Sequence, residues 1–287
     1  MVMRLVKFPG LKVKTPSVQT LGVLLFGLTS LCAIDSQADC MPAGAGEVAV
    51  IDRVYDGDTV KLKDGRHVRI LGLNAPEIDH GKEKSGQALG EEARKAAESF
   101  FSTNKQVRLF YDVQRVDRYE RTLAHVYDSK GNSLSAFLLR QGLGFHVAIP
   151  PNLSLNDCLH HQEAIARRKN LGVWGNSQWK PVPASHLTLK DTGFKRIGGR
   201  VVSVRKEQSV WLELDGPLVI KISPTDLKNF PVQNWASWKG VQVEVRGWVT
   251  ERSGNEDSGK NAKASARKPY KSLIIQPRIA GNLELLK

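Results

Sequence analysis

The sequence predicts a mainly β protein of the α+β kind: a small barrel braced by about three helices, followed by a smaller all-β domain. Three observations lead to this fold class. Short runs rich in β-branched residues, punctuated by Asp-Gly dipeptides, fill much of the first half. Segments with apolar residues at helical spacing lie between and after those runs. Short alternating runs separated by glycines then fill the second half, which indicates a second core made of strands.

The barrel is predicted to begin with three strands that follow one another directly. They cover residues 46–54, 59–62 and 67–73, and the dipeptides Asp56-Gly57 and Asp64-Gly65 between them favour tight turns. Two further strands are expected at residues 106–112 and 122–127.

Helices are expected at residues 87–101, 133–141 and 156–169. In the first, Glu91 and Glu92 lie early, where the helix macrodipole favours anions. Asn132 and Ser154 are the polar candidates for the N-caps of the second and third helices.

The second half is predicted to follow a linker. Residues 176–193 include Pro181 and Pro183, and the stretch around these prolines has no clear period, so we expect them to join a domain at residues 39–175 to another at 194–287. Strands of the second domain are expected at residues 196–204, 209–214, 218–222, 242–249 and 272–275. The polar stretch between Glu251 and Pro269 cannot supply a core and is expected to be a loop.

Four tryptophans of the second domain allow two interpretations. They either fill its core or form a face on which nucleotide bases stack, together with the lysines of the polar stretch. The residues are Trp211, Trp235, Trp238 and Trp248.

The first 38 residues are predicted to be a secretory signal peptide. Basic residues from Arg4 to Lys14 precede an apolar stretch that runs from Leu21 to Ile34, and Ser36-Gln37-Ala38 offers a cleavage site. We therefore expect an exported monomer, periplasmic or extracellular, without a stable membrane partner if the signal is cleaved. An uncleaved membrane anchor is the alternative.

Cysteine usage agrees with export. Cys32 would leave with the signal, and Cys40 and Cys158 would remain as an even pair. In an oxidising compartment such a pair suggests a disulfide. Two unpaired cysteines are the alternative, because the sequence does not show how far apart their Cα atoms lie.

The charge of the chain points to an anionic partner. With 42 Lys and Arg against 29 Asp and Glu, the formal net charge is +13. Such a protein is drawn to nucleic acid, anionic lipid or a cell-wall polymer, and charge alone does not choose among them.

The chemistry of the first domain rests on carboxylates and arginines. Asp56 and Asp58 lie on a turn and offer the oxygen ligands that a hard cation such as Ca²⁺ selects, whereas the sequence has no Cys or His cluster for zinc. The guanidinium groups of Arg69 and Arg121 suit a phosphate clamp. Glu77 could accept a proton from water. Together these residues predict metal-assisted hydrolysis of a phosphodiester.

Residues 47–174 resemble the staphylococcal nuclease (thermonuclease) family. The motifs that carry the resemblance are, in order, Asp56-Gly57-Asp58-Thr59-Val60-Lys61-Leu62, Arg69-Ile70-Leu71-Gly72-Leu73-Asn74-Ala75-Pro76-Glu77, Asp117-Arg118-Tyr119-Glu120-Arg121, Leu139-Arg140-Gln141-Gly142-Leu143 and Leu171-Gly172-Val173-Trp174. The resemblance implies a five-stranded OB-type barrel with helices. It also implies calcium-dependent hydrolysis of DNA and RNA with low sequence specificity, leaving 3′-phosphate ends. The second domain is similar to a smaller OB-like barrel.

The resemblance further implies roles for single residues. Asp58 would be a direct metal ligand, Thr59 would offer its backbone carbonyl, and Asp56 would support the metal site from close by. Arg69 and Arg121 would bind the scissile phosphate, Glu77 would orient or deprotonate the attacking water, and Tyr119 would line the nucleotide pocket. In the loop beside Glu77, Lys82 and Lys84 would touch the strand being cut.

Some positions depart from the family pattern. Asn74 stands where an aspartate ligand is usual, which predicts weaker calcium binding through a neutral amide oxygen. Glu120 replaces a usual glycine, and Ala148 and Pro150 stand near the usual tyrosines of the nucleotide pocket. The alternative function is therefore a catalytically weakened nucleic-acid-binding protein on the same scaffold. Whether DNA or RNA is preferred, and whether ends or interiors are cut, stays open.

Overall fold

The computed structural model describes residues 40–78, 86–101, 105–232, 234–252 and 271–286, and all of them belong to one compact unit of the chain. The predicted signal peptide, Lys82, Lys84 and most of the polar stretch between Glu251 and Pro269 lie outside these residues. Within the described ranges, no helix is both long and apolar enough to cross a membrane.

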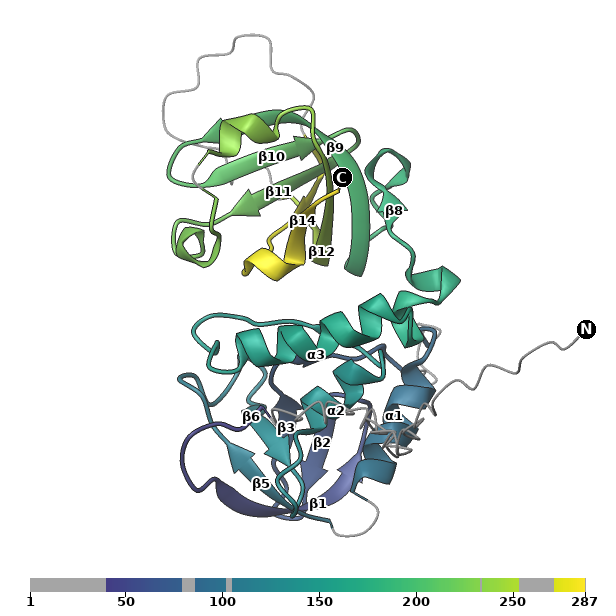
Figure 1. Cartoon of the computed structure of the whole chain (residues 1–287), viewed down its shortest axis with the longest axis vertical. Helices are drawn as coiled ribbons and strands as arrows, with labels where there is room; N and C mark the ends of the chain where they lie inside the picture. Colours follow the sequence, from purple (N-terminus) through teal and green to yellow (C-terminus); the bar gives the residue numbers. More distant parts are fainter. Residues whose placement is uncertain (1–39, 79–85, 102–104, 233, 253–270, 287) are drawn as a thin grey trace, which may run out of the picture. The chain divides into compact units, whose positions relative to one another are not determined.

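The first half folds into a closed five-stranded barrel with helices beside it, as predicted (Figure 1). The strands follow the order β1-β2-β3-β6-β5, and every pair is antiparallel except β3 with β6. They are β1 (Glu47–Val54), β2 (Thr59–Leu62), β3 (His67–Ile70), β5 (Gln106–Phe110) and β6 (Thr122–Tyr127). The short strands β4 (Leu73–Asn74) and β7 (Phe145–His146) pair with each other outside the barrel.

The helices are α1 (Gly90–Phe100), α2 (Leu134–Arg140) and α3 (Asn156–Arg168), and α2 packs against both of the others. The predicted N-caps are wrong by one residue. Ser133 caps α2 by accepting from the Ala136 N–H at 3.3 Å, because Asn132 instead donates its side-chain amide to Asp128 at 2.7 Å. Leu155 occupies the cap position of α3, without a side-chain hydrogen bond.

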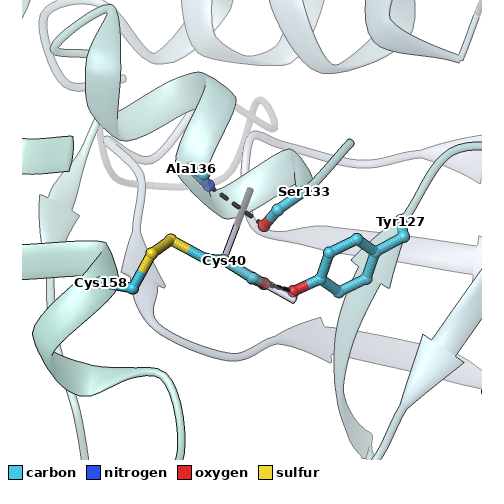
Figure 2. Close-up of a disulfide and its surroundings, with 5 residues drawn as sticks. All are labelled: Cys40, Tyr127, Ser133, Ala136 and Cys158. Carbon is cyan, nitrogen blue, oxygen red and sulfur yellow. Dashed lines mark hydrogen bonds between the residues drawn. A yellow bond between two sulfur atoms is a disulfide. The ribbon is translucent and has the colours of Figure 1, made fainter. Parts of the chain in front are cut away.

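A disulfide ties the beginning of the described chain to α3, as predicted. Cys40 and Cys158 are bonded, with their Cα atoms 5.6 Å apart. Figure 2 shows that the carbonyl of Cys40 also accepts a hydrogen bond from the hydroxyl of Tyr127, a fully buried residue of β6. The disulfide therefore links the segment before β1, which also contacts β6 through Tyr127, to helix α3.

The second half forms a seven-stranded sheet, and an additional pairing between β9 and β12 closes five of its strands into a ring. The ring runs β9-β10-β11-β13-β12, and only β11 and β13 are parallel. Strand order and the single parallel pair thus repeat those of the first barrel, which confirms the OB-like prediction. The strands are β8 (Val182–Pro183), β9 (Gly193–Lys206), β10 (Val210–Leu214), β11 (Leu218–Ile222), β12 (Gln242–Glu251), β13 (Leu273–Ile275) and β14 (Leu283–Leu285).

The residues predicted to be a linker are structured. Short 3-10 helices cover Ser177–Trp179 and Ala184–His186, and β8 between them pairs with β9. Trp179 is buried, and its indole N–H donates to the carbonyl of Ala88 at 2.9 Å. These contacts are long-range, so the local sequence pattern does not reveal them.

Candidate active site

The turn between β1 and β2 carries the first carboxylates and is fixed by close packing. A Cβ at Gly57 would lie 2.6 Å from the Cβ of Ala75, so only glycine fits between Asp56 and Asp58. The carboxylate of Asp58 accepts the backbone N–H of Ala75 at 2.7 Å, which ties the turn to the segment that carries Asn74 and Glu77. The spacing of the motif therefore follows from the packing of two backbone segments.

Asp58, Arg69 and Asn74 lie together. The guanidinium of Arg69 is 3.2 Å from Asp58 Oδ2 and 3.4 Å from Asn74 Oδ1. Sheet register explains this contact, because Arg69 pairs across β3 and β2 with Thr59, the neighbour of Asp58. The Asp58 side chain is 8% exposed and that of Arg69 15%, so the ion pair is largely shielded from water.

The carboxylates of this cluster repel one another, and the positive charge of Arg69 offsets the repulsion only in part. Burial raises the pKa of Asp56 to about 7, and repulsion by Asp58 and, more weakly, by Glu77 raises it further. The backbone N–H of Asp58 and the charge of Arg69 act in the opposite direction. A divalent cation would remove this repulsion. The predicted ligands are all oxygens, so the donor set fits a hard cation.

The predicted ligands differ in how available they are. Within the described residues, Asn74 Oδ1 accepts one long hydrogen bond, from the Arg69 guanidinium at 3.4 Å. The carbonyl of Thr59 already accepts the backbone N–H groups of Tyr55 at 2.9 Å and Asp56 at 3.4 Å. Asn74 is therefore better placed to hold a cation than the Thr59 carbonyl, whereas Asp58 would hold one while its two oxygens also accept from Ala75 and Thr59.

Arg121 is held by Asp117, a residue to which the sequence analysis gave no role. One oxygen of Asp117 accepts the Arg121 Nε–H at 2.8 Å, and the other accepts the backbone N–H groups of Tyr119 and Arg121. Burial would raise the pKa of Asp117, but these hydrogen bonds outweigh it and lower the pKa. Two backbone bonds to a carboxylate two and four residues earlier are typical of an Asx turn, which is the signal that could have revealed this residue.

The two arginines meet at one cavity. Arg69 and Arg121 both line a cavity of about 220 Å³, together with Asp117. The parallel pairing of β3 with β6 places the two arginines near each other, because Arg69 is opposite Leu123 and Leu123 is two residues after Arg121. Two arginines that line one cavity can bind one phosphate between them.

Glu77 lies apart from that cavity lining, at the carboxylate end of the cluster. Its charge acts on Asp56, and its backbone is held on both sides by Gln87. The Glu77 N–H donates to Gln87 Oε1 at 2.9 Å, and the Gln87 N–H donates to the Glu77 carbonyl at 2.8 Å. Gln87 therefore positions the Glu77 backbone, a role that no sequence pattern indicated.

A second group of metal-binding residue types lies elsewhere. His146, His160 and Glu163 have ligand atoms within 4.8 Å of one another. Glu163 already accepts the backbone N–H of His146 at 2.6 Å and an Arg246 guanidinium N–H at 2.5 Å. Because Arg246 neutralises this carboxylate, we assign no metal to the group.

The fold and the site together define a nuclease built on a small five-stranded barrel. Residues 67–176 match the family described as Staphylococcal nuclease homologue. The chain is 35% identical to Thermonuclease of Staphylococcus intermedius, over 45% of this chain and 77% of that protein. It is 33% identical to Thermonuclease of Staphylococcus hyicus, over 43% of this chain and 73% of that protein.

A further relative, Endonuclease YncB of Bacillus subtilis (strain 168), is 32% identical over 44% of this chain and 61% of its own length. The protein therefore belongs to the staphylococcal nuclease family. The family match ends at residue 176, before the strands of the second barrel begin.

Proposed function

We propose that the protein is an exported, calcium-dependent nuclease that hydrolyses phosphodiester bonds of DNA or RNA with low sequence specificity and leaves 3′-phosphate ends. One observation carries the proposal: Arg69 and Arg121 line one cavity, while Asp58 and Asn74 contact the guanidinium of Arg69. Export is supported by the disulfide, because such bonds persist mainly in oxidising compartments.

In the proposed reaction, bound Ca²⁺ would neutralise charge on the scissile phosphate and help to position a water molecule. Asp58 and Asn74 would hold this ion. Arg69 and Arg121 would bind the phosphoryl oxygens and stabilise the charge that develops on them. Glu77 would accept a proton from the attacking water, held in place by its two backbone bonds to Gln87.

The test is cleavage of DNA and RNA by the purified protein with Ca²⁺ and then with chelator, followed by analysis of the product ends. We expect cleavage with Ca²⁺ only, and 3′-phosphate ends.

Arg121→Lys keeps the charge of the side chain but loses the planar fork of the guanidinium, so it should lower kcat/KM by about 100-fold or more. Arg53→Lys is the matched control, because Arg53 is exposed and its guanidinium lies against the Tyr55 ring, away from both cavity arginines' carboxylate partners.

One observation favours a second candidate, a nucleic-acid-binding protein with weakened catalysis. The Arg69 guanidinium already donates to the carbonyls of Ile70 at 2.8 Å and Leu73 at 2.7 Å and pairs with Asp58. This leaves fewer donors for a phosphate. Binding without cleavage under Ca²⁺, Mg²⁺ and Mn²⁺ would support this candidate and contradict the nuclease.

A further inference from the structure

Strand β12 of the second barrel presents an exposed tryptophan. Trp211, Trp235 and Trp238 are 3 to 8% exposed and belong to the packed interior, whereas Trp248 is 43% exposed. The interpretation that the tryptophans fill the core therefore holds for these three and not for Trp248. Trp248 is the one of these four whose ring is open to a ligand.

Aromatic contacts hold Trp248 beside the candidate active site. Its ring meets Phe194 edge to face, with centroids 5.2 Å apart, and Phe194 in turn contacts Phe145 at 5.2 Å. Phe145 lies on β7, directly paired with Asn74. The exposed ring is thus fixed in place by a chain of packed rings that ends at a predicted metal ligand.

Trp248 lines the same cavity as Arg69 and Arg121. It also lines an adjoining groove of about 770 Å³, to which Tyr119 and Arg118 contribute from the first barrel and Thr250 and Gln276 from the second. Arg121 belongs to both hollows, so the groove continues from the proposed phosphate site.

The groove combines exposed aromatic rings with positive charge. Tyr119 is 63% exposed, and the guanidinium of Arg118 lies 4.7 Å from its ring centroid. Among the described residues that line the groove, four are arginines and Asp117 is the one acid. Arg246 and Arg278 are paired with Glu163 and Asp226, but Arg118 has no carboxylate partner within the described parts of the chain. Its charge is available to a phosphate.

Flat rings with arginines between them suit unpaired bases and their phosphates, since every base has a face that can stack. In a duplex these faces are covered by neighbouring base pairs. We propose that Trp248 stacks on an unpaired base of a single-stranded polynucleotide, next to the phosphate bound by Arg121, so that the second barrel supplies a substrate subsite. This inference rests on the proposed nuclease function and extends it to a region outside the family match.

The test measures binding and cleavage separately. Binding of a fluorescent single-stranded oligonucleotide and of a matched duplex is measured in chelator for wild type, Trp248→Ala and Trp248→Phe. We expect Trp248→Ala to weaken single-strand binding about tenfold or more, Trp248→Phe to retain most of it, and duplex binding to change little. With Ca²⁺, kcat/KM for the single strand should fall by the same factor, whereas hydrolysis of a small phosphodiester without a base should be unchanged.

Val202→Ala is the matched control, because Val202 is 40% exposed on β9 and does not line the groove. Thermal unfolding of each variant confirms that it is folded. Equal single-strand binding by wild type and Trp248→Ala would overturn the subsite, whether or not the protein cleaves. Trp248-dependent binding without hydrolysis of any substrate would instead support the subsite and overturn the proposed nuclease function.

Discussion

Arg69 shows how a single side chain can be fixed by the residues around it. Its guanidinium donates to two main-chain carbonyls and faces Asp58, so its rotamer is fixed before any substrate arrives. Such preorganisation reduces the cost of ordering the group in the transition state. The Arg69 guanidinium also lies 3.4 Å from Asn74 Oδ1. A change of charge at residue 74 would therefore act on this arginine as well as on a bound cation.

Asn74→Asp should strengthen calcium binding. The substitution keeps the size of the side chain and adds a carboxylate to the ligand set, and ligand charge is a main determinant of calcium affinity. We expect the calcium concentration for half-maximal cleavage to fall by about tenfold.

The measurement is a calcium titration of cleavage, with Asn176→Asp as control. Asn176 caps a short 3-10 helix by accepting from the Gln178 N–H, a role that aspartate can also fill. An unchanged apparent affinity in Asn74→Asp would count against Asn74 as a ligand.

Glu120 illustrates what the sequence can and cannot indicate for one residue. The sequence marks it as a departure from glycine, and the structure gives the reason for that preference: its φ is 63°, in the left-handed region. No local pattern, in contrast, distinguishes Trp248 from Trp211, because their exposure depends on which strands pair and what covers them.

At the scale of elements, local signals predicted the regular strands and helices. β6 and β11 have the predicted bounds, because β-branched runs between turn residues carry that information. The two-residue strands β4, β7 and β8 were missed, since each exists only through a partner far along the chain. Asp58, Arg69 and Arg121 were predicted as site residues from the motif, whereas Gln87 acts through a contact with Glu77 that only the folded chain reveals.

The disulfide should contribute measurably to the free energy of unfolding. It closes a loop across 118 residues of sequence, and restricting the unfolded chain over such a loop contributes up to about 4 to 5 kcal/mol. We expect Cys40→Ser with Cys158→Ser to lower the free energy of unfolding by an amount of this order. Denaturant unfolding with and without reductant measures it.

Reductant should destabilise the wild type and leave the double variant unchanged. Tyr127→Phe, which removes the hydrogen bond to the Cys40 carbonyl and keeps the disulfide, separates the contribution of this hydroxyl from that of the covalent link. Equal stability of oxidised and reduced wild type would contradict the expected contribution.

At the scale of the whole described chain, the two barrels are joined by paired charges. Arg246 of β12 binds Glu163 of α3, and Arg167 of α3 binds Glu284 of β14 at 2.6 Å. Three arginines, among them Arg196, lie within 5.4 Å of the Trp174 ring centroid. Removing one partner of the buried Arg246–Glu163 pair would leave the other charge without compensation, so this pair resists separation of β12 from α3.

Acid should weaken the fold through histidines buried near these contacts. Burial lowers the pKa of His125 to about 4, against an opposing effect of Asp112. Burial and then Arg246 lower the pKa of His146 well below its usual range. Because an unfolded histidine has a pKa of about 6.5, the unfolded chain binds more protons than the folded one between about pH 6.5 and 4. The contribution of these two histidines to the free energy of unfolding therefore falls as the pH falls through this window.

The contribution of His125 can be isolated by a substitution. The raised pKa of Asp56 acts in the opposite direction, since its stabilisation grows as the pH falls below about 7, but it is common to all variants and cancels in a comparison. From pH 7 to pH 5, His125→Leu should lose about 2 kcal/mol less stability than the wild type. Urea unfolding at both pH values measures this difference, with His161→Gln, on an exposed position of α3, as control. If wild type and His125→Leu lose the same stability on acidification, His125 is not the neutral buried group that its surroundings indicate.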